Sequence, residues 1–69
     1  MKVIYDSETD TLSLILAEAA VAESDELRDG LIIDYDQDGH IVSVELLDAS
    51  EHVTDPASIA FELKHAAAR

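Results

Sequence analysis

The sequence predicts an α+β domain, in which an antiparallel sheet of four or five strands made of hairpins carries a C-terminal helix packed on one face. Three observations lead to this expectation. Apolar and polar residues alternate in several short segments, which is the period of a β-strand. Clusters of turn-forming residues separate these segments. Finally, Asp55-Pro56 is a helix-start signal ahead of an alanine-rich segment.

The first expected hairpin joins residues 2–6 to residues 11–16. Residues 7–10 between them are polar turn formers, so the two segments can pair directly. We expect two cross-strand pairs, Tyr5 with Leu12 and Val3 with Leu14. This pairing places five apolar side chains on one side of the hairpin, namely Val3, Tyr5, Leu12, Leu14 and Leu16.

The next segments lead into the centre of the expected sheet. Residues 17–20 are expected to form a connection, because four residues cannot sustain a helix. Residues 21–27, VAESDEL, are a weak strand at best, and their acidic side chains suit an exposed edge. Residues 28–30 then turn the chain into the strand 31–36.

The central hairpin has two possible registers. A two-residue type I′ turn at Asp38-Gly39 would place Gln37 opposite His40. It would also gather six apolar side chains on one face, namely Leu31, Ile33, Tyr35, Val42, Val44 and Leu46. A longer turn with a bulge at Gly39 would shift the pairing by one residue and mix polar with apolar side chains on both faces. The hydrophobic pattern favours the two-residue turn.

Two helical segments are expected after the sheet, which should span residues 2–47. Asp48 and Glu51 have the spacing of a capping box, which predicts a short helical turn at about residues 49–53. The Asp55-Pro56 signal predicts a helix over about residues 56–67, with Phe61 pointing away from its packed side. All of these elements are expected to form a single domain, residues 1–69.

The length and the cysteine content limit how the fold can be reinforced. A chain of 69 residues buries only about 60% of the surface that its unfolded form exposes. The absence of cysteine excludes disulfides and thiolate metal sites, which leaves an ion bound through oxygen or nitrogen, or self-association. We expect self-association.

The formal charge of −12 narrows the classes of partner. Such a charge repels phosphate backbones and anionic lipid, so we expect no direct binding to nucleic acid or membranes. It would speed the encounter with a basic protein, although the charge can also serve solubility alone. No apolar stretch has the length of a signal peptide or a membrane span, and a cytoplasmic location is expected.

A second set of apolar residues falls on the other face of the expected sheet, between polar neighbours. These residues are Ile4, Ile15, Ile32, Ile41 and Leu47. If they gather, they form an apolar patch of the kind that marks a protein interface, and a homodimer is expected. The alternative is that they pack beneath the N-terminal segment or the helix.

Residues 34–45, DYDQDGHIVSVE, match the EF-hand calcium-loop pattern at every specified position. The flanking residues are β-branched and alternating, however, which predicts a hairpin where an EF-hand needs helices. Along an extended strand Glu45 would lie about 17 Å from the turn, too far to join Asp38 on one ion. We therefore expect no EF-hand, and Asp34 and Asp36 remain as weak candidates for an adventitious cation site.

No catalytic constellation is evident in the sequence. His40, His52 and His65 do not have the three- or four-residue spacing of a ligand pair on a helix. The chain has no nucleophile elbow and no glycine-rich phosphate loop, and it is short for a sizeable buried pocket. We expect no enzymatic activity of a lone subunit and no cofactor, while an active site shared with a partner stays open.

Three segments together carry a family resemblance. They are Tyr5-Asp6 with Glu8, Asp10 and Leu12; Gly30-Leu31-Ile32-Ile33-Asp34 running into Asp36-Gln37-Asp38-Gly39; and Glu45-Leu46-Leu47-Asp48-Ala49-Ser50. In order and spacing, over about residues 1–51, they resemble the small bacterial proteins of the domain of unknown function 2283 family. The resemblance offers no catalytic residues, so the motif residues are interpreted as structural. Some similar proteins are regarded as antitoxin-like partners of small toxin-like proteins.

Two functional hypotheses follow. The first is a non-enzymatic interaction module, a homodimer that binds a small basic protein in an antitoxin-like manner. Its expected partner-binding residues are Phe61, on the C-terminal helix outside the family pattern, and the apolar residues Ile32, Ile41 and Leu47. The second is a small cation- or ligand-binding domain that uses the acidic hairpin Asp34-Asp36-Asp38.

Overall fold

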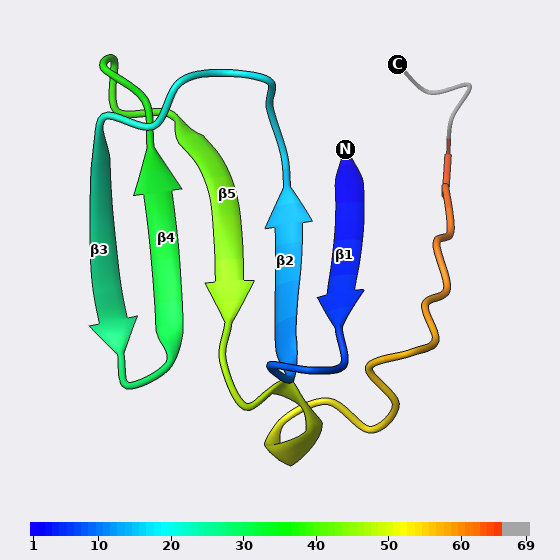
Figure 1. The fold of residues 1–69 in the computed structure, drawn as a ribbon. Coiled ribbons are helices and arrows are strands. Elements are labelled where there is room, and N and C mark those ends of the chain that lie inside the picture. Colours follow the sequence, from blue (N-terminus) through cyan, green and yellow to red (C-terminus); the bar gives the residue numbers. More distant parts are fainter. Residues whose placement is uncertain (66–69) are drawn as a thin grey trace.

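The computed structural model describes residues 1–65 and contains one antiparallel sheet of five strands (Figure 1). The strands are β1 (Lys2–Asp6), β2 (Thr11–Ile15), β3 (Glu23–Arg28), β4 (Leu31–Tyr35) and β5 (Ile41–Leu46). A 3-10 turn, η1 (Ala49–Glu51), follows the last strand. The strands extend over residues 2–46, where the sequence analysis expected a sheet over residues 2–47.

The order of the strands across the sheet is β1-β2-β5-β4-β3, which leaves β1 and β3 at the edges. The strands β3, β4 and β5 form a meander through two short turns. Residues 16–22 connect β2 to β3 across the end of the sheet at which the β4–β5 loop lies (Figure 1). The strand β2 pairs with β5. This arrangement is a Greek key, extended by β1 as a hairpin partner of β2.

The first hairpin has the predicted register, with Tyr5 opposite Leu12 and Val3 opposite Leu14. Its turn depends on Asp10, which adopts a positive φ of 55°, a conformation that Asp tolerates better than most residues. The expected edge strand is also confirmed. All six residues of β3 are exposed, and three of them are acidic. Acidic side chains at an edge discourage pairing with another copy of the same acidic chain.

The central hairpin combines the two registers considered from the sequence. The predicted two-residue turn is wrong, because the Asp36 N–H donates to the carbonyl of His40 and the Gly39 N–H donates to the carbonyl of Asp36. Gly39 has a φ of 83°, as a turn with a bulge at this position requires. The pairing then shifts again beyond Tyr35, which lies opposite Ile41.

The second shift restores the register that the hydrophobic pattern favours. Val42 is the extra residue of β5, and after it Ile33 lies opposite Val44 and Leu31 opposite Leu46. Burial of the apolar face thus determines the pairing over most of the hairpin, and a β-bulge absorbs the mismatch with the turn. Val42 itself is buried.

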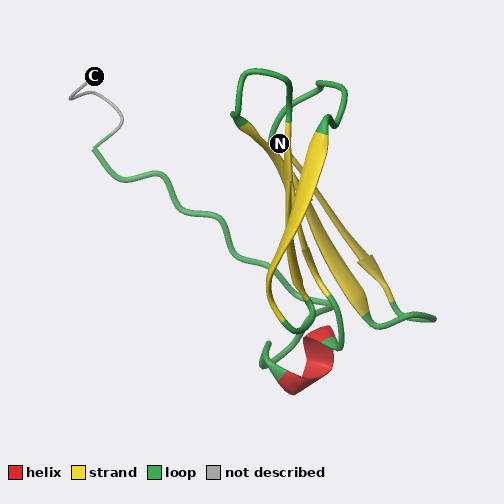
Figure 2. Cartoon of the chain, turned by 90° about the vertical axis from the view of Figure 1, so that its left-hand side faces the viewer, coloured by secondary structure: helices red, strands yellow, loops and turns green. Residues whose placement is uncertain are grey.

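The predicted fold class is wrong, because the described residues contain no α-helix and the protein is mainly β. The helix expected over residues 56–67 is absent as far as residue 65, and residues 66 and 67 lie outside the described part of the chain. The start signal forms only one turn, in which the Ala57 N–H donates to Asp55 Oδ1 and the Ser58 N–H donates to the carbonyl of Asp55. The chain then continues without a helix and slants away from the sheet (Figure 2).

The residue pattern explains this outcome. Ile59, Phe61 and Leu63 recur every second residue, which places all three on one side of an extended chain, whereas a helix would set Phe61 opposite Ile59 and Leu63. An isolated helix of about twelve residues is also marginal in water unless an apolar face is packed. The turn expected at about residues 49–53 is present as η1, although the Asp48 side chain makes no capping hydrogen bond.

The sheet has an apolar face that we call the front face, formed by two cross-strand rows of four side chains. The rows are Val3, Leu14, Val44 and Ile33, and Tyr5, Leu12, Leu46 and Leu31. Only Ile33 of these eight is buried. The opposite face, called the back face, carries mostly polar side chains between isoleucines. Among the described residues no helix is long and apolar enough to span a membrane.

Candidate functional site

An acidic groove lies where β3 begins and β4 ends, beside the loop of the central hairpin. Its volume is about 580 Å³. The residues that line it are Ala22, Glu23, Asp25, Tyr35, Asp36, Gln37, Asp38 and Gly39. Four of these eight carry a carboxylate and none is a lysine or an arginine. The lining therefore combines a high density of negative charge with one aromatic ring.

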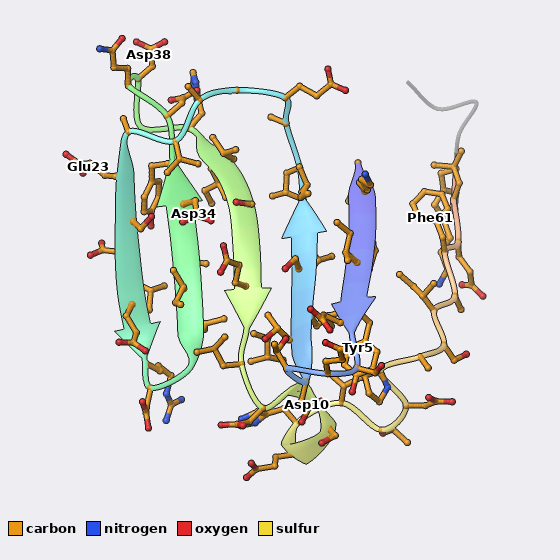
Figure 3. The ribbon with its side chains drawn as sticks, viewed as in Figure 1. Tyr5, Asp10, Glu23, Asp34, Asp38 and Phe61 are labelled. Carbon is orange, nitrogen blue, oxygen red and sulfur yellow. The ribbon has the colours of Figure 1, made fainter. Side chains whose placement is uncertain are left out.

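The sheet positions the carboxylates of β3 next to the ring of Tyr35. Glu23 lies opposite Tyr35 in the pairing of β3 with β4, and Asp25 lies opposite Ile33. Residues that face each other across antiparallel strands point to the same side of the sheet, so Glu23, Asp25 and Tyr35 share one face. Because β3 is an edge strand and is exposed throughout, the groove is open to solvent (Figure 3).

The hairpin loop holds a third carboxylate in a fixed position. Asp36 Oδ1 accepts hydrogen bonds from the backbone N–H groups of Asp38 and His40, both at 2.9 Å. The His40 N–H is the main reason why the pKa of Asp36 lies below its ordinary value, with a further contribution from the Asp38 N–H. Asp36 therefore stays ionised and stabilises the loop.

The groove fits a lysine or arginine side chain. Carboxylates form strong charge-assisted hydrogen bonds with such cations, and an aromatic face attracts a cation within about 6 Å of its centroid. Beside the loop, His40 Nδ1 lies 3.5 Å from Asp36 Oδ2, and the His40 side chain is 80% exposed. Sequence reasoning identified the acidic hairpin but missed Glu23, Asp25 and Tyr35, because their proximity depends on the register of β3 with β4.

The trio Asp34, Asp36 and Asp38 is not brought together. Asp34 lies on the back face and is only 6% exposed. Its two carboxylate oxygens accept hydrogen bonds from Ser24 Oγ and Ser43 Oγ, each at 2.6 Å. These two bonds hold the pKa of Asp34 below its ordinary value, and that of Ser24 has the larger effect.

A different set of three side chains does meet at the loop. Ligand atoms of Asp36, Asp38 and His40 lie within 4.8 Å of one another. Of the two weak cation candidates, Asp34 and Asp36, the cluster contains only Asp36, together with Asp38 and His40. His52 and His65 belong to no such cluster among residues 1–65.

The back face holds a second carboxyl beside Asp34. Burial raises the pKa of Glu45 above its ordinary value, and its hydrogen bond to Asp34 and the charge of Asp34 raise it further. Both residues belong to the calcium-like motif, but they act here as a carboxyl pair on strands β4 and β5. The sequence signal was the alternation of the two strands, which places Asp34, Ser43 and Glu45 on one face.

The predicted partner-binding residues do not form one patch. Ile32 lies on the back face between Glu45 and Glu26. Ile41 is exposed at the bulge opposite Tyr35, and Leu47 follows β5, where its N–H donates to the carbonyl of Gly30. Phe61 is exposed on the C-terminal segment, at the far side of the sheet from the acidic groove (Figure 3).

The motif residues of the first hairpin and of the corner after β5 meet at Asp10. Tyr5 Oη donates to Asp10 Oδ1 at 2.7 Å, and Ser50 Oγ donates to Asp10 Oδ2 at 2.6 Å. The Ala49 N–H donates to the carbonyl of Asp10, and Ala49 is fully buried. The hydrogen bond from Ser50, followed by that from Tyr5, lowers the pKa of Asp10. This cluster joins β1, β2 and η1 and is structural.

Fold and surface together define a small, acidic, single-sheet β domain. A family model matches residues 2–50, which include all five strands and the first two residues of η1. The chain belongs to this family, described as protein of unknown function, DUF2283. No curated protein and no solved structure matched the chain. The C-terminal segment lies outside the matched residues.

Proposed function

We propose that this protein is a non-enzymatic interaction module that binds a basic segment of a partner protein in the acidic groove. The observation that carries the proposal is the lining of the groove, in which four carboxylates occur together with Tyr35 and no lysine or arginine is present. The net charge of −12 would steer a basic partner toward this surface. The family resemblance makes a small, basic, toxin-like protein the first kind of partner to test.

The position of the groove on an edge strand suits an extended peptide. An edge strand presents unpaired backbone N–H and C=O groups, with which a peptide can pair as an additional strand. Side chains of such a peptide alternate between the two faces, so every second residue would point toward the side of Glu23 and Asp25. A peptide with lysine or arginine at alternate positions is therefore the best match.

The first experiment identifies the partner. The tagged protein is recovered from its native cells at low and at high salt, and the retained proteins are determined by mass spectrometry. One stoichiometric basic protein that is lost at high salt supports the proposal, because salt screens charges at an exposed surface. Retention of the partner to the same extent at low and high salt contradicts the proposal that charge attraction holds the complex together.

The second experiment tests the groove itself. The double variant Glu23→Gln/Asp25→Asn should weaken binding of the partner, or of a synthetic peptide with alternating lysines, by about tenfold or more, which corresponds to about 1.4 kcal/mol. The control Glu8→Gln/Glu62→Gln removes the same charge from exposed positions away from the groove. Equal losses in the two variants, measured by calorimetry, would show that only net charge matters and that the groove is not the site.

A second candidate function is cation binding at the loop, favoured by the convergence of Asp36, Asp38 and His40. Two carboxylates and an imidazole suit zinc or manganese better than calcium. Titration calorimetry with each ion, including calcium, tests the idea. Asp38→Asn and His40→Gln should abolish binding without loss of the fold, while Asp29→Asn should not. The absence of heat at millimolar ion eliminates this function.

A further inference from the structure

The front face is largely uncovered. The sequence predicted a helix over it, and the described residues provide none. Seven of its eight side chains are at least partly exposed, and no large side chain of the described residues is fully buried. A sheet normally buries its apolar face against a second layer. One sheet alone therefore leaves this fold without its second layer.

The chain exposes more surface than a compact protein of the same mass. The chain exposes 5605 Å², whereas a compact protein of 7.5 kDa exposes roughly 4,250 Å². Its radius of gyration is 13.7 Å, compared with about 11 Å for a compact chain of this length. The excess of about 1,350 Å² is shared between the uncovered sheet and the extended C-terminal segment, and it exceeds the roughly 800 Å² that each partner buries in a standard protein interface.

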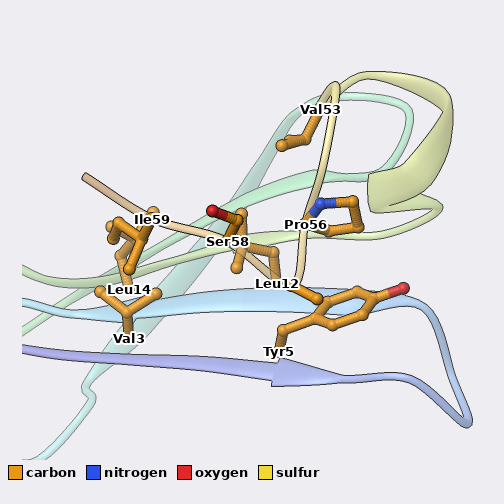
Figure 4. Close-up of a pocket in the computed structure, with 9 residues that line it drawn as sticks. Val3, Tyr5, Leu12, Leu14, Val53, Pro56, Ser58 and Ile59 are labelled. Carbon is orange, nitrogen blue, oxygen red and sulfur yellow. The ribbon is translucent and has the colours of Figure 1, made fainter.

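The residues that follow β5, as far as the structure describes them, cover only part of the front face. A groove of about 440 Å³ lies between the β1–β2 end of this face and the C-terminal segment (Figure 4). Val53, Pro56 and Ile59 approach Val3, Tyr5, Leu12 and Leu14 there. Beyond this point the segment leaves the sheet (Figure 2), and Ile59, Phe61 and Leu63 are 69%, 75% and 71% exposed. His52, which follows η1, lines a separate groove with Leu31 of β4 and Leu46 of β5.

We propose that a second copy of the chain covers the front face, so that two five-stranded sheets pack face to face as a β-sandwich dimer. Two-sheet packing is the usual way in which an antiparallel sheet buries an apolar face. The face carries no charge in its two rows, so two chains of −12 can approach without placing charges in the contact. Glu23 and Asp25 lie at its β3 margin, where they would form a polar rim.

This proposal is tested by the mass in solution, separately from any binding in the acidic groove. Sedimentation equilibrium of the full chain should give twice the 7.5 kDa of one chain. A wild-type protein that is monomeric at about 100 µM, where an interface of standard size is normally occupied, overturns the proposal. The wild-type measurement does not depend on whether any variant folds.

Two neighbouring residues of β1 provide a matched pair of variants. Val3 lies on the front face and is 36% exposed, whereas Ile4 lies on the back face and is 41% exposed. Val3→Glu should raise the dimer dissociation constant at least tenfold, and Ile4→Glu should change it less than threefold. The reverse result would place the interface on the back face and overturn the proposal. Circular dichroism of both variants checks that the sheet is retained.

Discussion

At the residue scale, Asp34 and Glu45 show how placement on β-strands changes the chemistry of two residues that match a calcium-loop motif. In the calcium-loop pattern both would be ion ligands, but the strands place them together on the back face, beside Ser24 and Ser43. Two hydroxyl donors favour the ionised form of Asp34, while burial and the neighbouring charge favour the protonated form of Glu45. Two such groups titrate as a coupled pair.

The opposite pKa shifts predict how this pair affects stability as the pH changes. The lowered pKa of Asp34 means that its contribution is present above its unfolded pKa, about 3.9, and is lost as the pH falls through its folded value. The raised pKa of Glu45 means that its contribution is present below its unfolded pKa, about 4.3, and is lost as the pH rises through its folded value.

Glu45→Gln should therefore stabilise the protein at pH 7, because a neutral amide can donate to Asp34 without a second charge. We expect the midpoint of thermal unfolding, Tm, to rise by a few degrees at pH 7 and the gain to shrink as the pH approaches about 4. Thermal unfolding followed by circular dichroism measures both. Glu18→Gln, an exposed change of equal charge, is the control. A gain of the same size in the control would attribute the effect to net charge.

At the element scale, the central hairpin shows which parts of the fold could be predicted. The alternation of apolar residues predicted the pairs Ile33–Val44 and Leu31–Leu46 correctly, since burying one face fixes them. The same rule could not predict the turn, where Gly39 and the hydrogen bonds of Asp36 determine the loop. The extra residue, Val42, accommodates both the register of the strands and the geometry of the turn. No single residue in the sequence predicts such a bulge.

The two glycine turns allow a direct test of backbone strain. Gly30 and Gly39 have φ values of 85° and 83°, and a Cβ would meet nothing within 4 Å at Gly39 and only ordinary contacts with Leu47 at Gly30. Gly30→Ala and Gly39→Ala should each cost about 1–2 kcal/mol of unfolding free energy, from conformation alone. Gly39→Asn should cost less, because Asn tolerates this conformation. Urea unfolding measures the three values, and equal costs for Ala and Asn at residue 39 would contradict this account.

The C-terminal segment shows why the fold class was not predicted. Asp55-Pro56 is a genuine local signal and forms one turn, but a start signal does not supply the packing that sustains a helix. The every-second-residue spacing of Ile59, Phe61 and Leu63 fits an extended chain, whereas in a helix Phe61 would lie off the face shared by Ile59 and Leu63. The acidic groove could be predicted only in part, because its β3 side depends on a pairing that VAESDEL specifies weakly.

At the scale of the whole molecule, the proposed dimer would make the stability of this single sheet depend on the protein concentration. If two copies share a core, the Tm should rise with protein concentration, because binding of a second copy stabilises the folded state by mass action. Calorimetry over about a hundredfold range of concentration measures this dependence. Val3→Glu should show a weaker dependence than Ile4→Glu, and a wild-type Tm that is independent of concentration would contradict the shared core.

The Greek-key order also has a consequence for how the chain folds. The hairpins β1–β2 and β3–β4–β5 each pair residues that are close in sequence, whereas β2 must find β5, and Asp10 must find Ser50, forty residues away. Closing that long loop costs entropy before any contact compensates for it. The encounter of β2 with β5 should therefore be the rate-limiting event.

Leu14→Ala, at this junction, is expected to slow refolding, while Leu31→Ala, beside the local turn of Gly30, is expected mainly to speed unfolding. Stopped-flow kinetics of the two variants would reveal the reverse pattern if the local hairpins were the slow step.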